Sequence, residues 1–162
     1  MAGKVTTSGS EALVRHFAKT NPGQAVGGNA PILLDNEDAV WLVAAGKVEV
    51  FVVALKNGEP VGSRRHCLTV VPGEAMFGMH VARANRDVGL LAVGAVGTHL
   101  IRLNPSELKR AAVDGSLRAG VVDIVERWVA GLSRDVWKPS RPRPRAEVQL
   151  LPNSPAHLKD GE

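Results

Sequence analysis

The chain has 162 residues, about the length of one domain, and its apolar content of 44% is normal for a globular protein. Aromatic residues make up only 4%, so the core must consist mostly of Val, Leu, Ile and Ala. The single cysteine, Cys67, excludes an intrachain disulfide, the N-terminus lacks the apolar run of a signal peptide, and no segment reaches the roughly 18 apolar residues that indicate a membrane span. We therefore expect a soluble cytosolic domain.

The first 30 residues are expected to form a loosely patterned segment with one short helix. Ser10 is its predicted N-cap, and the helix ends at Phe17 with Leu13 and Val14 on the same face as Phe17. The run NPGQAVGG at residues 21–28 then breaks the helix. The sheet is expected to begin at residues 32–34.

Short apolar runs separated by glycine turns follow, and they predict an antiparallel β-roll of jelly-roll type. Asn57-Gly58 is a strong hairpin signal, since both residues tolerate positive φ. Residues 80–86 are expected to be a polar loop. The predicted strands cover residues 39–45, 47–55, 64–71, a short stretch around Met76, 88–93 and 98–103.

Beyond residue 104 the apolar spacing changes to three and four residues, which predicts helices. Asn104 caps a short helix over 105–112 with Pro105 at its first position, and a longer helix runs from Ser116 to about Trp137. Its predicted inner face carries Leu117, Val121, Ile124, Val125, Trp128 and Leu132. The expected organisation is a segment at 1–30, a β-roll at 31–104, packing helices at 105–137 and a Pro/Arg-rich linker or tail at 138–162. The fold class is mainly β with a C-terminal helix.

The residue patterns that carry catalysis are missing from this sequence. The five histidines are isolated, without the clustered His and carboxylate ligands of a metal site. There is no Gly-x-Ser-x-Gly and no Walker-type phosphate loop, and the His66 side chain points to the opposite strand face from Cys67, which is expected to be buried and inert. We expect no catalytic residues, no metal and no cofactor.

Lys138, Arg141, Arg143 and Arg145 crowd into one Pro-rich stretch of the tail. No aromatic residue lies among them to stack on bases, so no nucleic-acid partner is expected. A solvated linker is the favoured interpretation of this stretch. An adaptor that sits on an anionic membrane through residues 138–145 is a weaker alternative.

A Pro-Gly-Glu turn and a Phe-Gly pair resemble the start of the phosphate-binding cassette of cyclic-nucleotide-binding domains. In that family the glycine exposes backbone N–H groups to the phosphate, an acidic residue takes the ribose hydroxyl and an arginine pairs with the phosphate. Here Met79 stands where the acid is expected, and Asp87 follows the candidate arginine, which comes early. The resemblance favours the fold without the ligand. The candidate ligand-binding residues are Gly73, Glu74, Phe77, Gly78 and Arg86.

Four ordered pieces, residues 33–53, 62–79, 89–103 and 124–133, are similar to the N-terminal region of ABC transporters from NHLM-type bacteriocin export systems. The resemblance spans about residues 32–137. It implies a non-catalytic cytosolic accessory or regulatory domain with a cyclic-nucleotide-binding-like β-roll, placed at the cytoplasmic face of the membrane. The implied partners are the transmembrane and ATPase parts of a peptide exporter and a precursor peptide. The alternative is a freestanding sensor of a cyclic nucleotide or another small anion.

Overall fold

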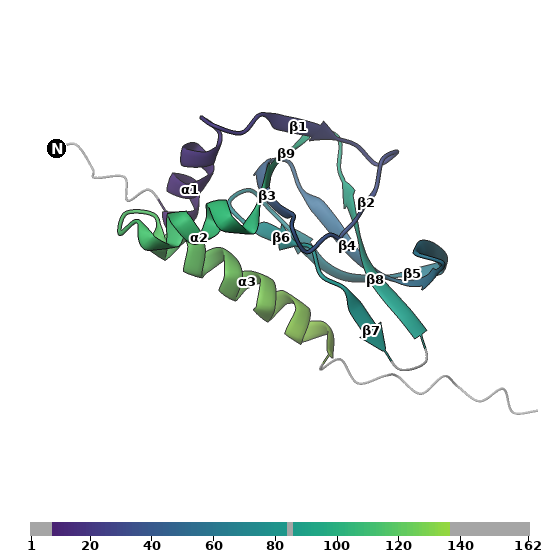
Figure 1. The fold of residues 1–162 in the computed structure, drawn as a ribbon. Helices are drawn as coiled ribbons and strands as arrows, with labels where there is room; N and C mark the ends of the chain where they lie inside the picture. Colours follow the sequence, from purple (N-terminus) through teal and green to yellow (C-terminus); the bar gives the residue numbers. More distant parts are fainter. Residues whose placement is uncertain (1–7, 84–85, 137–162) are drawn as a thin grey trace, which may run out of the picture.

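Two antiparallel sheets and three helices make up residues 8–83 and 86–136, which are the part of the chain described by this computed structural model (Figure 1). One sheet has the strand order β1-β9-β3-β6, and the other has β2-β8-β4-β5 with β7 paired to β8. In chain order the elements are α1 (Gly9–Phe17), β1 (Gly23–Val26), β2 (Ile32–Leu33), β3 (Val40–Ala45), β4 (Val48–Lys56), β5 (Glu59–Val70), β6 (Ala75–Phe77), β7 (Val81–Arg83), β8 (Arg86–Gly94), β9 (Thr98–Leu103), α2 (Pro105–Val113) and α3 (Arg118–Val136). The predicted β-roll is confirmed.

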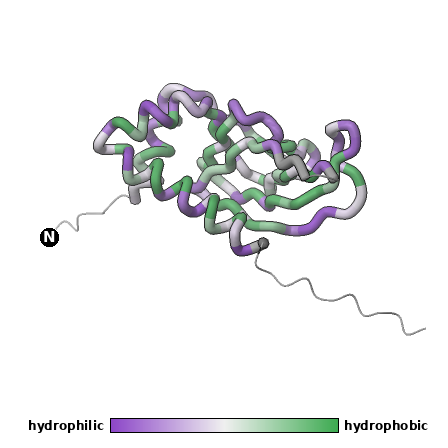
Figure 2. Tube along the Cα trace, turned by 60° about the horizontal axis from the view of Figure 1, so that its bottom comes forward, coloured by the Kyte–Doolittle hydropathy of each residue, from purple (hydrophilic) through white to green (hydrophobic). Residues whose placement is uncertain are grey.

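Two apolar clusters hold this arrangement together. The first joins the inner faces of the two sheets and includes Val43, Val50, Met76, Leu90 and Leu100. The second lies between the β3 and β9 strands and the helices, and it includes Leu13, Leu42, Ile101, Leu108 and Ile124. Figure 2 shows hydrophobic residues concentrated along the strands of the roll and along the helices that cover it.

Local sequence signals place the β4–β5 hairpin and the start of α2 correctly. Asn57 and Gly58 have φ values of 55° and 79°, as a two-residue hairpin turn requires. Asn104 Oδ1 accepts a hydrogen bond from the Ser106 N–H at 2.9 Å, and the Glu107 carboxylate accepts one from the Asn104 N–H at 2.8 Å. These two bonds form the capping box that begins α2.

The local predictions for β1, for β7 and for the N-cap of α1 are wrong. The sheet begins at β1, before residue 32, because β1 is an exposed edge strand on β9 in which only Val26 is buried, so it lacks an apolar alternation. Residues 81–83 form β7 instead of a loop, since they pair with β8. The N-cap of α1 is Ser8, and Ser10 lies buried inside the first turn.

Strand β5 starts at Glu59, five residues before the predicted start. The tight turn brings the chain directly alongside β4, so Pro60 and Val61 already pair with Leu55 and Ala54. Proline is tolerated because β5 is the edge of its sheet, where the missing N–H breaks no ladder.

The helix α3 begins at Arg118 and packs its inner face on the roll. Leu117, Val121, Ile124 and Trp128 are buried as predicted, but Val125 is 39% exposed and does not belong to the inner face. The helix turns by about 100° per residue, so Val125 lies about 40° from Val121 and about 60° from Trp128 around the helix axis, at the edge of the inner face. No helix among the described residues is long and apolar enough to cross a membrane. The predicted tail at 138–162 lies outside the described residues.

Helices α1 and α3 cross with their backbones in direct contact. A Cβ atom added to Gly120 would lie 2.3 Å from the Gly9 carbonyl oxygen, and one added to Gly9 would lie 2.9 Å from the Gly120 nitrogen. Only glycine fits on both sides of such a crossing. The pair therefore fixes the start of α1 against the first turn of α3.

Gly78 provides a test of the junction between β6 and the loop before β3. A Cβ atom there would lie 1.7 Å from the Asn36 carbonyl oxygen, while one at Gly23 would meet nothing within 4 Å. We expect Gly78→Ala to lower the free energy of unfolding by about 2 to 3 kcal/mol, because a backbone has to move. Gly23→Ala, the matched control, should change it by less than about 0.5 kcal/mol in urea denaturation. Equal effects of the two substitutions would contradict the packing described for this junction.

Candidate functional site

The predicted residues Gly73 and Glu74 form the turn that connects β5 with β6. Gly73 has φ +85° and its N–H donates to the Val43 carbonyl at 3.0 Å, while the Glu74 N–H donates to the Val71 carbonyl at 3.0 Å. The Glu74 carboxylate accepts from the Val71 N–H at 3.0 Å and lies 3.4 Å from Arg127 Nη1 on α3. Both residues therefore hold the turn, and Glu74 ties it to α3.

The other predicted residues lie after this turn. The Gly78 N–H donates to the Ala39 carbonyl at 3.0 Å, and the Met79 N–H donates to the Leu34 carbonyl at 2.9 Å. Phe77 is half-buried, with its ring 6.1 Å from the Trp128 ring. Arg86 opens β8 opposite Arg83, and its side chain lies outside the described part of the structure. Binding of an anion by the predicted set of residues stays a prediction, but these four amide donors are already used by the fold.

An apolar groove of about 400 Å³ opens where Phe77 and Gly78 meet the helices. Its walls come from β3, the end of β6, α2 and α3, so the β-roll and both C-terminal helices contribute. Glu37 and Lys109 supply its charged groups. The remaining lining residues are Ala39, Val40, Phe77, Gly78, Pro105, Leu108, Ala112, Val121 and Val125.

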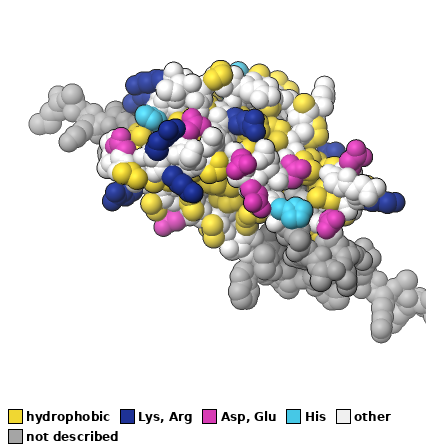
Figure 3. Space-filling model, viewed as in Figure 1, with side chains coloured by type: hydrophobic (Ala, Val, Ile, Leu, Met, Phe, Trp, Pro, Cys, Tyr) yellow, Lys and Arg dark blue, Asp and Glu magenta, His cyan; other side chains and the backbone are white. Residues whose placement is uncertain are grey.

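The outer face of α3 continues this apolar surface. Val122, Val125 and Val129 are 49%, 39% and 55% exposed, and their spacing places them along one side of the helix. We call these three residues the valine stripe. Val125 belongs to both the stripe and the groove, so the two are contiguous. Figure 3 shows hydrophobic side chains exposed among charged ones on the face that carries α2 and α3.

A second cleft of about 430 Å³ lies between α1, α2 and the turn before α3. Its polar residues serve the helix ends: the Glu107 carboxylate belongs to the α2 capping box, and Asp114 accepts from the Ser116 amide and hydroxyl. The hydroxyl and amide of Ser116 lower the pKa of Asp114. Its carboxylates therefore have local structural roles. The lining residues are His16, Phe17, Thr20, Glu107, Arg110, Ala111, Asp114 and Leu117.

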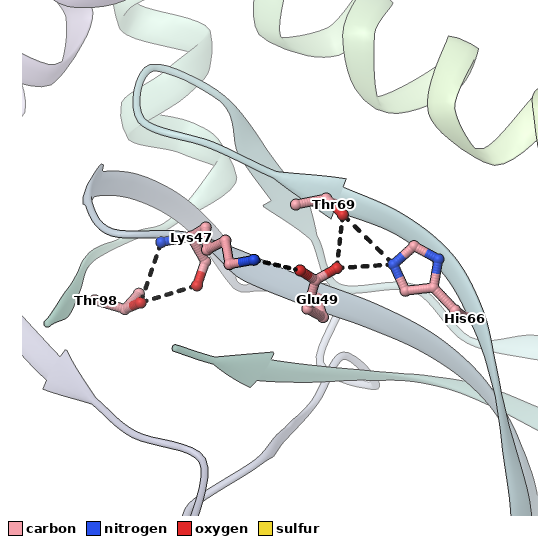
Figure 4. Close-up of polar contacts among 5 residues, drawn as sticks. All are labelled: Lys47, Glu49, His66, Thr69 and Thr98. Atoms are coloured by element: carbon pink, nitrogen blue, oxygen red, sulfur yellow. Dashed lines mark hydrogen bonds and ion pairs between the residues drawn. The ribbon is translucent and has the colours of Figure 1, made fainter. Parts of the chain in front are cut away.

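A polar network on the outer face of β4 and β5 centres on Glu49 (Figure 4). Its carboxylate accepts hydrogen bonds from Thr69 Oγ1 at 2.6 Å and His66 Nε2 at 2.8 Å, and Lys47 Nζ lies 3.2 Å away. The bond from Thr69, followed by those from His66 and Lys47, lowers the pKa of Glu49 to about 2. Thr69 donates to Glu49 and lies 3.4 Å from His66, so these residues do not form a nucleophile with its base.

Residues 8–83 and 86–136 contain no group of three His, Cys, Asp or Glu residues that could hold a metal ion. Cys67 is buried and His66 is exposed, which confirms that they face opposite ways. Within the same described residues, Trp128 Nε1 is the buried side-chain nitrogen or oxygen that has no hydrogen-bond partner. Its ring packs with Phe77 between α3 and the roll. Sequence spacing predicted the burial of Trp128 but not its unpartnered N–H.

Comparisons with known proteins match the fold without identifying a family. No family model and no curated protein matches the chain. A CooA mutant from Carboxydothermus hydrogenoformans superposes with a TM-score of 0.52 at 12% identity over 75% of each chain. Unbound oxidised CprK gives a TM-score of 0.56 at 11% identity over 77% of this chain and 58% of the CprK chain. CprK complexed with OCPA gives 0.55 at 13% identity, over 80% of this chain and 59% of that one.

The match to CprK thus spans less than two thirds of the CprK chain. None of these comparisons links the chain to peptide exporters. At this level of identity the similarity establishes the fold alone, which is the cyclic-nucleotide-binding-like β-roll that the sequence predicted.

The Glu49 network predicts a pH-dependent contribution to stability. The folded-state pKa of about 2 lies below the ordinary value of 4.5, so the contribution is full above pH 4.5 and is lost as the pH falls toward 2. The Glu49 carboxylate and its partners are partly exposed to solvent. We therefore expect Glu49→Gln to lower the free energy of unfolding by about 1 kcal/mol at pH 6 and by progressively less below pH 4.5. Urea unfolding across this range measures the difference. Thr69→Val should act in the same direction and add little in the double variant, whereas a pH-independent difference would contradict the assignment.

Proposed function

We propose that this chain is a non-catalytic regulatory domain that acts by docking to a protein partner through the groove and the valine stripe. The observation that carries the proposal is the exposure of Val122, Val125 and Val129 directly beside an apolar groove of about 400 Å³. Contiguous exposed apolar surface with charged residues around it marks interaction sites in soluble proteins.

The geometry of the β5–β6 turn favours docking over nucleotide binding. A cyclic phosphate needs free backbone N–H donors, and those of Gly73, Glu74, Gly78 and Met79 all bond to carbonyls of the same chain. The Glu74 carboxylate is held by the Val71 amide and by Arg127, so it is not available for a ribose hydroxyl. The residues resembling the cassette thus have roles in building the fold.

The partner we propose is the cytoplasmic part of a bacteriocin-type peptide exporter, together with its precursor peptide. Support comes from the resemblance at residues 33–53, 62–79, 89–103 and 124–133. The last of these pieces includes Val129 of the valine stripe and Trp128 on the inner face of the same helix. The domain would then work at the cytoplasmic face of the membrane.

A charge in the groove tests docking. We expect the tagged chain to retain the cytoplasmic part of a bacteriocin-type exporter and its precursor peptide, and Val125→Asp to reduce that retention at least about tenfold, because it places a charge in an apolar contact. Val96→Asp is the matched control, since Val96 is 99% exposed in the β8–β9 turn. Recovery of neither partner by the unsubstituted chain, or equal recovery by Val125→Asp, would refute the proposal.

A second candidate function is sensing of a small effector, favoured by the unpartnered Trp128 Nε1 between α3 and the roll. One of the similar structures holds oxidised CprK in complex with o-chlorophenolacetic acid. An acidic aromatic compound accepting a hydrogen bond from Trp128 would explain the buried donor. Such a ligand would link effector binding to the position of α3.

Calorimetry separates docking from sensing. We expect no binding heat with cyclic AMP, cyclic GMP or o-chlorophenolacetic acid at millimolar concentration. Micromolar binding of a cyclic nucleotide that is lost in Arg86→Ala would support the predicted anion site. Micromolar binding of the aromatic acid that is lost in Trp128→Phe, with Trp41→Phe as the control, would support sensing through the Trp128 N–H.

A further inference from the structure

We propose that residues 148–151 of this same chain, Val-Gln-Leu-Leu, dock onto the groove and the valine stripe and thereby compete with the partner. The intramolecular contact stands on its own, and only the competition rests on the proposed function. The occupant is identified by its composition, because residues 148–151 are the apolar run in an otherwise polar and Pro-rich segment, 138–162.

The surface is large enough to need cover and apolar enough to take this segment. The groove is lined by Val40, Phe77 and Leu108 from three different elements, and Val125 and Val129 extend it along α3. Three apolar side chains from one short segment fit a groove of about 400 Å³ without leaving a charge inside.

The distance between the segment and the groove is within reach of the chain. Val125 lies eleven residues before the end of α3 at Val136, which is about 16 Å at 1.5 Å per helical residue. Residue 148 lies twelve residues after Val136, and a Pro-rich segment spans about 3.1 Å per residue, or roughly 37 Å. The segment can therefore run back along α3 and arrive at the groove with length to spare.

A weak contact suffices because the two parts are joined. A short linker gives an effective concentration in the millimolar range, so a contact with a dissociation constant of about 0.25 mM would cover the groove for about 80% of the time. A partner that binds the same surface more tightly displaces such a cover. The affinity of residues 148–151 for the groove would then determine how tightly a partner must bind in order to displace them.

Thiol labelling of the full-length chain tests the contact. The probe substitution is Val125→Cys, and the native Cys67 is buried and common to every sample. We expect Leu150→Asp together with Leu151→Asp to raise the alkylation rate at position 125 about fivefold, the ratio expected from 80% cover. Asn153→Asp with Ser154→Asp adds the same two charges outside the apolar run and should leave the rate unchanged. A cysteine at a second probe position, Val96→Cys, should be alkylated at the same rate in the chain with the native tail and in both tail variants.

Two results would overturn the proposal. Equal labelling at position 125 in all tail variants would show that residues 148–151 do not cover the groove. A labelling rate that rises when the chain with the native tail is diluted would assign the cover to a second copy instead. Neither result depends on the exporter, so failure of the contact is distinguishable from failure of the docking function, which the retention experiment measures separately.

Discussion

The turn at Gly73 and Glu74 is the constraint on which the rest of the structure depends. It carries the chain from the sheet that contains β5 to the sheet that contains β6, and it exchanges backbone hydrogen bonds with Val43 of β3. Its glycine packs against Ser10 of α1, and its carboxylate reaches Arg127 of α3. One turn thus sets the spacing of both sheets and the position of two helices. A positive φ at its apex explains why glycine is required there.

This junction accounts for the location of the interaction surface. Glu74 and the ring pair of Phe77 and Trp128 hold the inner side of α3, and the side that carries Val122, Val125 and Val129 is left partly exposed beside the groove. The helix therefore has an apolar face on the roll and a narrower apolar face away from it. Exposed valines that adjoin an apolar groove favour a further contact, whether within the chain or with another molecule.

The sequence predicted correctly those turns and helix starts that are determined by a few neighbouring residues. Asn57-Gly58 and the Asn104 capping box determine their own backbone conformations, so both were found without tertiary information. Strands β1 and β7 were missed because their formation depends on pairing with β9 and β8, and their own residues carry little apolar alternation. At the site, the sequence did single out Phe77 and Gly78, but as residues that bind an anion. Their position in an apolar groove follows only from how α2 and α3 pack. Helical spacing alone assigned Val125 to the inner face, but a rotation of about 40° from Val121 brings it to the edge of that face, where it is 39% exposed.

The crossing of α1 and α3 at Gly9 and Gly120 has a mechanical consequence. Side chains between two helices usually adjust by changing rotamer, and such adjustment absorbs small shifts of one helix against the other. Here the two backbones touch without intervening side chains, so no such buffer exists at this point. A displacement of α3 caused by a molecule bound on its outer face passes directly to α1, and from there through Ser10 to the Gly73 turn. Helices α1 and α3 are therefore expected to shift together, and Ser10 of α1 lies against the β5–β6 turn.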